Sequence, residues 1–166
     1  SSGNKAYGDK PFTLKAKAQG TITYTSSDKK VAAIGRTNGK VTLKGCGIAT
    51  ITIKAAGNSK YNSATKKVTI TVKPKKQVIT ALSSKKKTFT IKWKKDSKAT
   101  GYKIQYATNQ KFKKAASLTI KKNSTTTQTV RKAMKAGKKY YVRVCAFKTY
   151  KKKTIQGTWS KAKSVK

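Results

Sequence analysis

The sequence contains no histidine and no glutamate, and its only side-chain carboxylates are those of Asp9, Asp28 and Asp96. A Ser–His–Asp triad, a Cys–His pair or a paired-carboxylate site therefore cannot be assembled. Zinc and calcium sites lack ligands as well. A Ser–Lys pair is the one catalytic arrangement still open, but serines beside lysines are unavoidable in this composition. We predict that the protein is not an enzyme and uses no cofactor and no metal.

Long apolar runs and a cysteine framework are also missing. No run of 18 apolar residues exists, so we expect no membrane-spanning helix. The amino-terminal stretch SSGNKAYGDK has no apolar signal core, and any secretion signal was removed or lies outside this chain. Two cysteines, Cys46 and Cys145, are too few for a disulfide-rich scaffold. We expect both to be free thiols.

Positive charge is what the sequence has in excess. It holds 42 Lys and Arg residues against 3 acidic ones, a net charge of +39, and only Arg36, Arg131 and Arg143 are arginines. Such a chain is expected to meet anionic partners, among them nucleic acid, anionic cell-wall polymer such as teichoic acid, acidic glycan or acidic membrane. Lysine is a flexible point charge, whereas arginine gives bidentate recognition. Diffuse attraction is therefore favoured, with nucleic acid bound only non-specifically. A genomic bias toward lysine codons explains the composition equally well.

Alternating apolar and polar residues dominate the chain. The stretches KVTLKG, GIATITIKAAG and KKVTITVKP repeat at period two, with Thr and β-branched residues that suit a pleated surface. Asn38-Gly39 and Gly57-Asn58 are typical of turns. No segment shows a sustained helical period. The predicted fold class is all-β.

A change in composition suggests where two domains join. Proline within KPKKQ, residues 73–77, ends one strand and disfavours continuous pairing into the next. We therefore predict domains at residues 1–74 and 75–166. The first carries 14 basic and 2 acidic residues, a charge of +12, and the second carries 28 basic and 1 acidic, a charge of +27. Electrostatic binding should reside mainly in the second domain.

The stretch KKKTFTIKWKK, residues 85–95, has two interpretations. Aromatic residues between lysines could form a stacking platform for single-stranded nucleic acid. Phe89, Ile91 and Trp93 lie at every second position, however, so lysine and apolar side chains fall on opposite faces. A strand with one buried face is favoured. The lysines predicted to attract a polyanion are Lys85, Lys86, Lys87, Lys92, Lys94, Lys95, Lys151, Lys152 and Lys153.

The second domain resembles the fibronectin type III family. KTFTIKWKKDSKATGYKIQYAT supplies the Trp of the second strand and the GY-x-V-x-Y third strand, and MKAGKKYYVRVCAFK matches the L-x-P-G-x-x-Y-x-V-x-V signature, with Met134 and Ala136 in place of Leu and Pro. The resemblance implies a β-sandwich in which Trp93, Tyr102 and Tyr140 are structural. Tyr140 would be the tyrosine-corner residue, with its hydroxyl bonded to nearby backbone.

The first domain resembles the bacterial Ig-like domain of group 2 type, through Tyr24–Ser27, Val31–Ile34, the Gly39–Val41 turn and the GIATITI strand. The first family strand is expected to be short or absent. Together the two resemblances imply two consecutive Ig-like/fibronectin type III β-sandwiches. Such pairs resemble lysine-rich tails of secreted or wall-associated proteins of Gram-positive gut bacteria. The implied role is a spacer, adhesive or polymer-binding module, secreted or at the cell surface, and we expect a monomer.

A second candidate surface lies on the strand that carries Tyr140. If Tyr140, Val142 and Val144 face inward, then Tyr141, Arg143, Cys145 and Phe147 face outward. This row is either a contact surface for a protein receptor or glycan, or is covered by lysine stems or by the other domain. The alternative function is therefore a specific receptor-binding module, acting through Tyr141, Arg143 and Phe147 and directed at a host by likeness to its own domains of this family.

Overall fold

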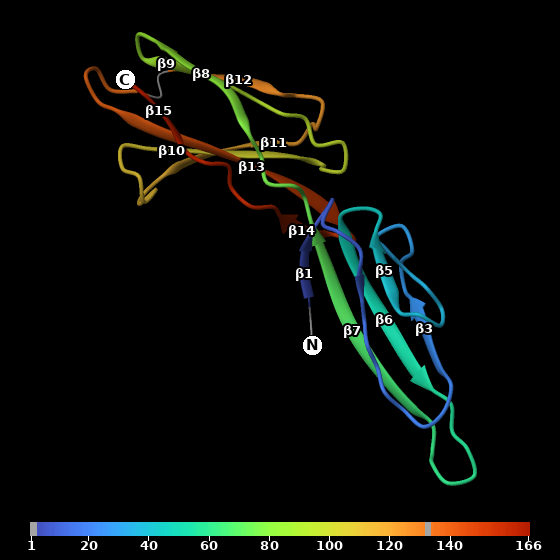
Figure 1. Cartoon of the computed structure of the whole chain (residues 1–166). Helices are drawn as coiled ribbons and strands as arrows, with labels where there is room; N and C mark the ends of the chain where they lie inside the picture. Colours follow the sequence, from blue (N-terminus) through green and yellow to red (C-terminus); the bar gives the residue numbers. More distant parts are fainter. Residues whose placement is uncertain (1–2, 132–133) are drawn as a thin grey trace. The chain divides into compact units, whose positions relative to one another are not determined.

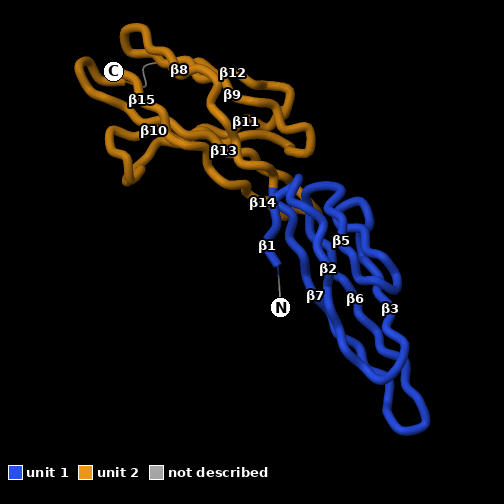
Figure 2. Tube along the Cα trace, viewed as in Figure 1, with its two compact units in different colours: residues 1–73 blue, residues 74–166 orange. Residues whose placement is uncertain are grey.

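All regular secondary structure in the chain is β-strand (Figure 1), as seen in a computed structural model that describes residues 3–131 and 134–166. This confirms the predicted all-β class. The chain divides into two compact units, residues 1–73 and 74–166 (Figure 2). The described residues contain no helix of the length and apolar character needed to cross a membrane.

Unit 1 contains two sheets. The larger has the order β1-β7-β6-β3, from Gly3–Ala6, Ala64–Lys73, Gly47–Ala55 and Ile22–Ser26. The smaller has the order β2-β5-β4, from Phe12–Thr13, Lys40–Leu43 and Ala32–Ile34. The short first strand β1 pairs with β7 in parallel, whereas the other pairs are antiparallel.

The core of unit 1 follows from the period-two pattern. Along β6, Ala49, Ile51 and Ile53 are buried while Lys54 is exposed. The Asn38-Gly39 turn forms as expected: Gly39 has a φ of 63° and the side-chain oxygen of Asn38 accepts the Lys40 N–H at 3.0 Å. Gly57-Asn58 lies within a longer loop, residues 56–63, because β6 ends at Ala55 and β7 begins at Ala64.

Unit 2 is a sandwich of a three-stranded and a five-stranded sheet. The first has the order β12-β9-β8, from Thr127–Val130, Thr88–Trp93 and Ile79–Lys85. The second has the order β11-β10-β13-β14, from Ala116–Ile120, Gly101–Ala107, Tyr140–Tyr150 and Lys153–Gln156. Strand β15, Lys163–Val165, pairs with the other end of β13.

The unit 2 core lies between the inward rows of these sheets. Phe89, Ile91 and Trp93 of β9 are buried, and Lys92 between them is exposed. Trp93 packs edge-on against Tyr102 of β10, with ring centroids 5.3 Å apart. The side chains of Tyr140, Val142 and Val144 complete the core from β13. The central part of the lysine-rich stretch 85–95, Thr88–Trp93, is therefore a strand with one buried face.

A buried polar network holds the loop between β9 and β10. Asp96 is buried and accepts backbone N–H groups from Lys75 at 3.1 Å and Lys98 at 2.9 Å. Its own backbone N–H donates to the Tyr102 hydroxyl at 2.8 Å, and that hydroxyl donates to the carbonyl of Asn123 at 3.1 Å. Burial raises the pKa of Tyr102. The hydroxyl stays protonated and links two loops.

The Tyr140 hydroxyl also bonds to nearby backbone. It accepts the backbone N–H of Lys135 at 3.2 Å, five residues upstream. Gly137 lies between these residues with a φ of 70°, a conformation that side chains other than glycine adopt at a cost. The bond fixes the chain where it enters β13.

Turn tips of unit 2 carry lysine in left-handed backbone conformations. Lys86 has a φ of 55°, Lys114 of 51°, Lys151 of 45° and Lys152 of 64°. The β13–β14 hairpin is closed by Lys151 and Lys152 alone, because Tyr150 pairs with Lys153. Two positive φ angles in a two-residue hairpin favour Asn-Gly, and an L-residue there costs roughly 1–2 kcal/mol.

Replacing this hairpin turn should stabilise unit 2. We predict that Lys151→Asn/Lys152→Gly raises its free energy of unfolding by about 1 kcal/mol or more, because Asn and Gly adopt positive φ at lower cost. Urea unfolding followed by tryptophan fluorescence measures the change, since Trp93 and Trp159 both lie in unit 2. Lys151→Gln/Lys152→Gln removes the same charge without relieving the strain and is the matched control. Equal stabilisation by both variants would show that charge repulsion, and not turn geometry, is responsible.

Removing the Tyr102 hydroxyl should destabilise unit 2. We expect Tyr102→Phe to lower its free energy of unfolding by about 1–3 kcal/mol, because the Asp96 N–H and the Asn123 carbonyl lose their buried partner. The control is Tyr106→Phe, on the same strand with a half-buried ring. Hydrogen exchange resolved by segment should show the loss in residues 74–166 alone. Comparable loss of protection in residues 3–73 would contradict two separately folded units.

Candidate functional site

The nine lysines predicted to attract a polyanion are all exposed, but they do not form one cluster. Lys85, Lys86 and Lys87 occupy the β8–β9 turn, and the Lys87 carbonyl accepts the N–H of Met134, shortly before β13 begins. Lys151–Lys153 follow the other end of β13. That strand has eleven residues and spans roughly 33 Å at about 3.3 Å per residue. The two triplets therefore lie at opposite ends of unit 2.

The other three lysines lie nearer the β13–β14 end. Lys94 and Lys95 begin the connection from β9 to β10, and β10 starts at Gly101, which pairs with Phe147 toward the hairpin end of β13. Lys92 lies on the outer face of the smaller sheet, between the buried Ile91 and Trp93. Each end of the sandwich thus carries its own group of cations.

The outer face of the larger sheet has a central arginine that is already held by its neighbours. The Arg143 guanidinium lies 4.0 Å from the ring centroid of Phe112 and 4.6 Å from that of Trp159. Its Nε and Nη2 donate to Oε1 of Gln105 at 3.0 and 2.7 Å. Gln105 is its cross-strand partner on β10. With two aromatic rings beside it and two of its nitrogens bonded to Gln105, the Arg143 guanidinium links β10 and β13 across the sheet face.

Two residues of the row from Tyr141 to Phe147 are buried, so the row is only partly exposed. Phe147 is only 9% exposed and Cys145 is fully buried. The Phe147 ring lies over Gly101, the residue opposite it on β10, where a Cβ atom would approach the ring to 2.9 Å. Cys145 lies opposite Lys103 and beside Arg143, and burial raises its thiol pKa to about 12. The thiol is protonated at neutral pH and unreactive.

Tyr141 lies in the same row and is half-exposed. The ammonium group of Lys139 lies 5.6 Å from its ring centroid. Sequence reasoning missed Phe112 and Trp159, the two residues that enclose Arg143. Phe112 comes from the β10–β11 connection and Trp159 from the link between β14 and β15, so only the folded sheet brings them together.

The hairpin end of the same face contains an open groove with a volume of about 370 Å³. Its floor includes Phe147, and the lysines Lys103 and Lys121 lie along it. The remaining lining residues are threonines and Gln156, from β14. Sequence analysis did not identify this groove, because its residues come from four strands and their ends.

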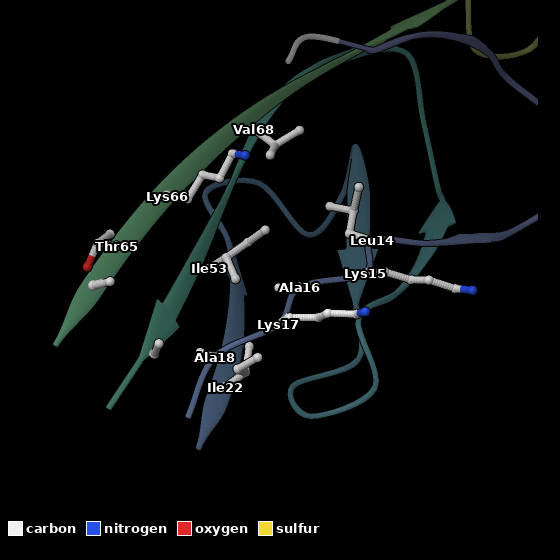
Figure 3. Close-up of a pocket in the computed structure, with 12 residues that line it drawn as sticks. Leu14, Lys15, Ala16, Lys17, Ala18, Ile22, Ile53, Thr65, Lys66 and Val68 are labelled. Carbon is white, nitrogen blue, oxygen red and sulfur yellow. The ribbon is translucent and has the colours of Figure 1, made fainter. Parts of the chain in front are cut away.

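Unit 1 has a groove of its own, with a volume of about 450 Å³ (Figure 3). Ile53 of β6 and Val68 of β7 line one wall, and the segment from Leu14 to Ala18 lines the facing wall. Strands of the smaller sheet have only two to four residues, so this segment covers the inner face of β6 and β7 there. The lining is mainly aliphatic, with lysines at the rim.

The described residues of the two units contain no metal-binding cluster. No group of three His, Cys, Asp or Glu side chains is close enough to hold a metal ion there. Each of the three aspartates accepts at least one backbone N–H: Asp9 from Ala6, Asp28 from Lys30, and Asp96 from Lys75 and Lys98. What the surface offers is lysine charge and a few aromatic rings.

Comparison with known proteins agrees with this architecture. The family described as intimin, immunoglobulin-like domain matches residues 9–57, and the fibronectin type III domain family matches residues 72–163. The predicted order of an Ig-like domain followed by a fibronectin type III domain is thereby confirmed. No curated protein matches the chain.

Similar solved structures include those of two chicken proteins. A two-domain fibronectin type III segment of chicken tenascin is 18% identical, with a TM-score of 0.50 over 82% of this chain and 80% of that one. The FN1–FN3 domains of chicken CNTN1 are 17% identical with a TM-score of 0.48, and the match covers 99% of this chain and 64% of that longer chain. At these identities the likeness concerns the fold alone.

Domains of these two families are typical extracellular adhesive or spacer modules and are generally non-catalytic. The sandwich of unit 2, with its buried Trp93 and the Tyr140 hydroxyl bonded to upstream backbone, has the features of the second family. The chain belongs to the fibronectin type III family, with an intimin-type Ig-like domain preceding the fibronectin type III domain.

Proposed function

We propose that the two domains form a non-catalytic, secreted or cell-wall-associated spacer and adhesive module that binds anionic polymers through the lysines of unit 2. Teichoic acid and acidic glycans are the polymers of matching charge, and nucleic acid would be held only non-specifically. The protein acts as a monomer and needs no cofactor. The observation that carries the proposal is a large cationic surface with almost no carboxylate to neutralise it.

The charge balance leaves the lysines available to an external anion. Three carboxylates cannot neutralise 42 cations, and those of Asp9 and Asp96 are bonded to backbone N–H groups. The region after Pro74 carries +27 against +12 before it. A surface of this kind attracts polyanions over about a Debye length, roughly 8 Å at physiological salt.

Turn geometry adds support. Among residues 3–131 and 134–166, five non-glycine residues have positive φ, and four of them are lysines at the tips of three different connections in unit 2. Asparagine or glycine would fit those conformations at lower cost. Lysine at these positions gives up stability and places charge on exposed turns of the sandwich. A protein whose turns contact an anionic polymer gains binding affinity in return for this loss of stability.

A second candidate function is specific binding of a protein receptor. The observation that favours it is the cluster of Phe112, Arg143 and Trp159 with Tyr141 nearby on the same sheet face. All four are half-buried, and aromatic residues and arginine are enriched in protein interfaces. Phe147 is 9% exposed, lines the groove at the hairpin end and is not part of this cluster.

The salt dependence of binding shows whether unit 1 or unit 2 holds the polyanion, and it distinguishes polyanion binding from receptor binding. For a polyanion, log affinity falls with log salt by about 0.7–0.9 for each charge neutralised, the value measured for nucleic acids. We predict that glutamine at five unit 2 lysines flattens this slope for heparin more than glutamine at five exposed unit 1 lysines. The first set is Lys85, Lys87, Lys94, Lys95 and Lys153, and the second is Lys10, Lys29, Lys44, Lys54 and Lys60.

Both variants lose five charges, so the comparison is matched in net charge, and isothermal titration at four salt concentrations supplies the slopes. An equal change in the two would refute the assignment to unit 2. Tyr141→Ser should leave the slope unaltered. If instead Tyr141→Ser abolishes binding that survives high salt, the receptor function replaces the polyanion function.

A further inference from the structure

The groove on the outer face of the larger unit 2 sheet combines three kinds of chemistry in one concavity. It lies at the hairpin end of β10, β11, β13 and β14 and holds about 370 Å³. This is within the roughly 300–1,000 Å³ range of small-ligand clefts. The lining includes one aromatic ring, two ammonium groups, one carboxamide and several hydroxyls, and it contains no carboxylate.

Strand register explains why the groove exists. Phe147 pairs with Gly101 on one side and with Gln156 on the other. Because Gly101 has no side chain, the Phe147 ring occupies the space above it and forms a low floor. The Cβ atom of a larger residue at position 101 would come within 2.9 Å of the Phe147 ring, so the ring would have to move. The same Cβ atom would collide with the Ile120 carbonyl oxygen. The glycine and the phenylalanine together keep this part of the face hollow.

The cations are positioned by the same register. Lys103 follows Gly101 on the same face of β10 and pairs with Thr119 of β11, while Lys121 comes just after β11 ends. Lys103 is half-buried and Lys121 is exposed. Lys103 also lies opposite Cys145, whose protonated thiol contributes no negative charge to neutralise it. Both ammonium groups therefore remain available to an anion in the groove.

The remaining lining residues of the groove supply groups that can form hydrogen bonds. Gln156 is exposed at the end of β14, and Thr154 lies two residues before it on the same face. The Thr100 hydroxyl accepts the Thr149 N–H at 3.0 Å and so is partly engaged. The hydroxyls of Thr119 and Thr154 and the amide of Gln156 can both donate and accept.

We propose that this groove binds one acidic pyranose residue of an anionic glycan. A pyranose ring has hydroxyls that require donors and acceptors at its edge, which the threonines and Gln156 supply, and an apolar C–H edge that can contact the small part of the Phe147 ring that lines the groove. A carboxylate on that ring would lie toward Lys103 and Lys121. A linear phosphate polymer uses the lysines but has no ring hydroxyls for the threonines and Gln156. The inference rests on the proposed polyanion binding and adds a specific subsite to it.

The test uses the full chain with two probes, a hyaluronan tetrasaccharide that contains glucuronate and an inorganic polyphosphate of similar charge. Affinities are measured by isothermal titration at 50 and 150 mM salt. The groove variants are Lys103→Gln/Lys121→Gln and the uncharged pair Thr119→Val/Gln156→Ala. The control variant is Lys85→Gln/Lys87→Gln, which removes two exposed lysines at the opposite end of unit 2.

For the tetrasaccharide, we expect the Lys103/Lys121 variant to lose affinity by about tenfold or more and the Thr119/Gln156 variant by about threefold or more. The Lys85/Lys87 control should lose less than about twofold. For polyphosphate, the two lysine variants should lose similar affinity, and the Thr119/Gln156 variant should bind as the unaltered chain does. Circular dichroism of each variant confirms the fold before titration.

Other outcomes separate the subsite from the broader function. If the unaltered chain binds polyphosphate but not the tetrasaccharide, or if groove and control variants lose tetrasaccharide affinity equally, the subsite is overturned while polyanion binding stands. If the unaltered chain binds neither probe at 50 mM salt, both the subsite and the polyanion function are overturned.

Discussion

Strand β13 imposes the constraint on which the rest of unit 2 depends, because its alternation assigns every second side chain to the core and the others to the outer face. It pairs with β10 along one edge and with β14 and β15 along the other. Its inward residues Tyr140, Val142 and Val144 close the core. Its outward residues Arg143 and Phe147 shape the outer face of the larger sheet. Arg143 fills one end of the face, and Phe147 forms the floor of the groove at the other.

A chain with so few carboxylates cannot rely on ion pairs for stability. Burial of apolar side chains and hydrogen bonds to backbone take that role, as the Asp96–Tyr102–Asn123 network shows. The unneutralised lysines repel one another and are placed on turns and outer faces, where water and salt screen them. The expected cost of this arrangement is lower stability at low salt, and the use that we propose for it is attraction of polyanions. Under this proposal, added salt raises stability and weakens binding.

Local pattern was enough to predict the strands and the core. Phe89, Ile91 and Trp93 alternate with polar residues, and period two alone indicates which face is buried. The same rule placed Cys145 and Phe147 on the outer face correctly but could not show that neighbours cover them. The burial of an outward side chain depends on the residue opposite it, which is Gly101 for Phe147 and Lys103 for Cys145. The alternation of one strand does not encode this cross-strand register. The groove and the Arg143 cluster were missed for that reason, since Phe112, Trp159, Lys121 and Gln156 are brought together only by the folded sheet.

The central claim is that polyanions contact the lysines of unit 2. Acetylation of lysine side chains, read by mass spectrometry with and without a saturating anionic polymer, tests it residue by residue on the unaltered chain. The account predicts strong protection at Lys85–Lys87, Lys94, Lys95 and Lys151–Lys153, with much weaker protection across residues 3–73. Equal protection in both units, or protection confined to unit 1, would contradict it.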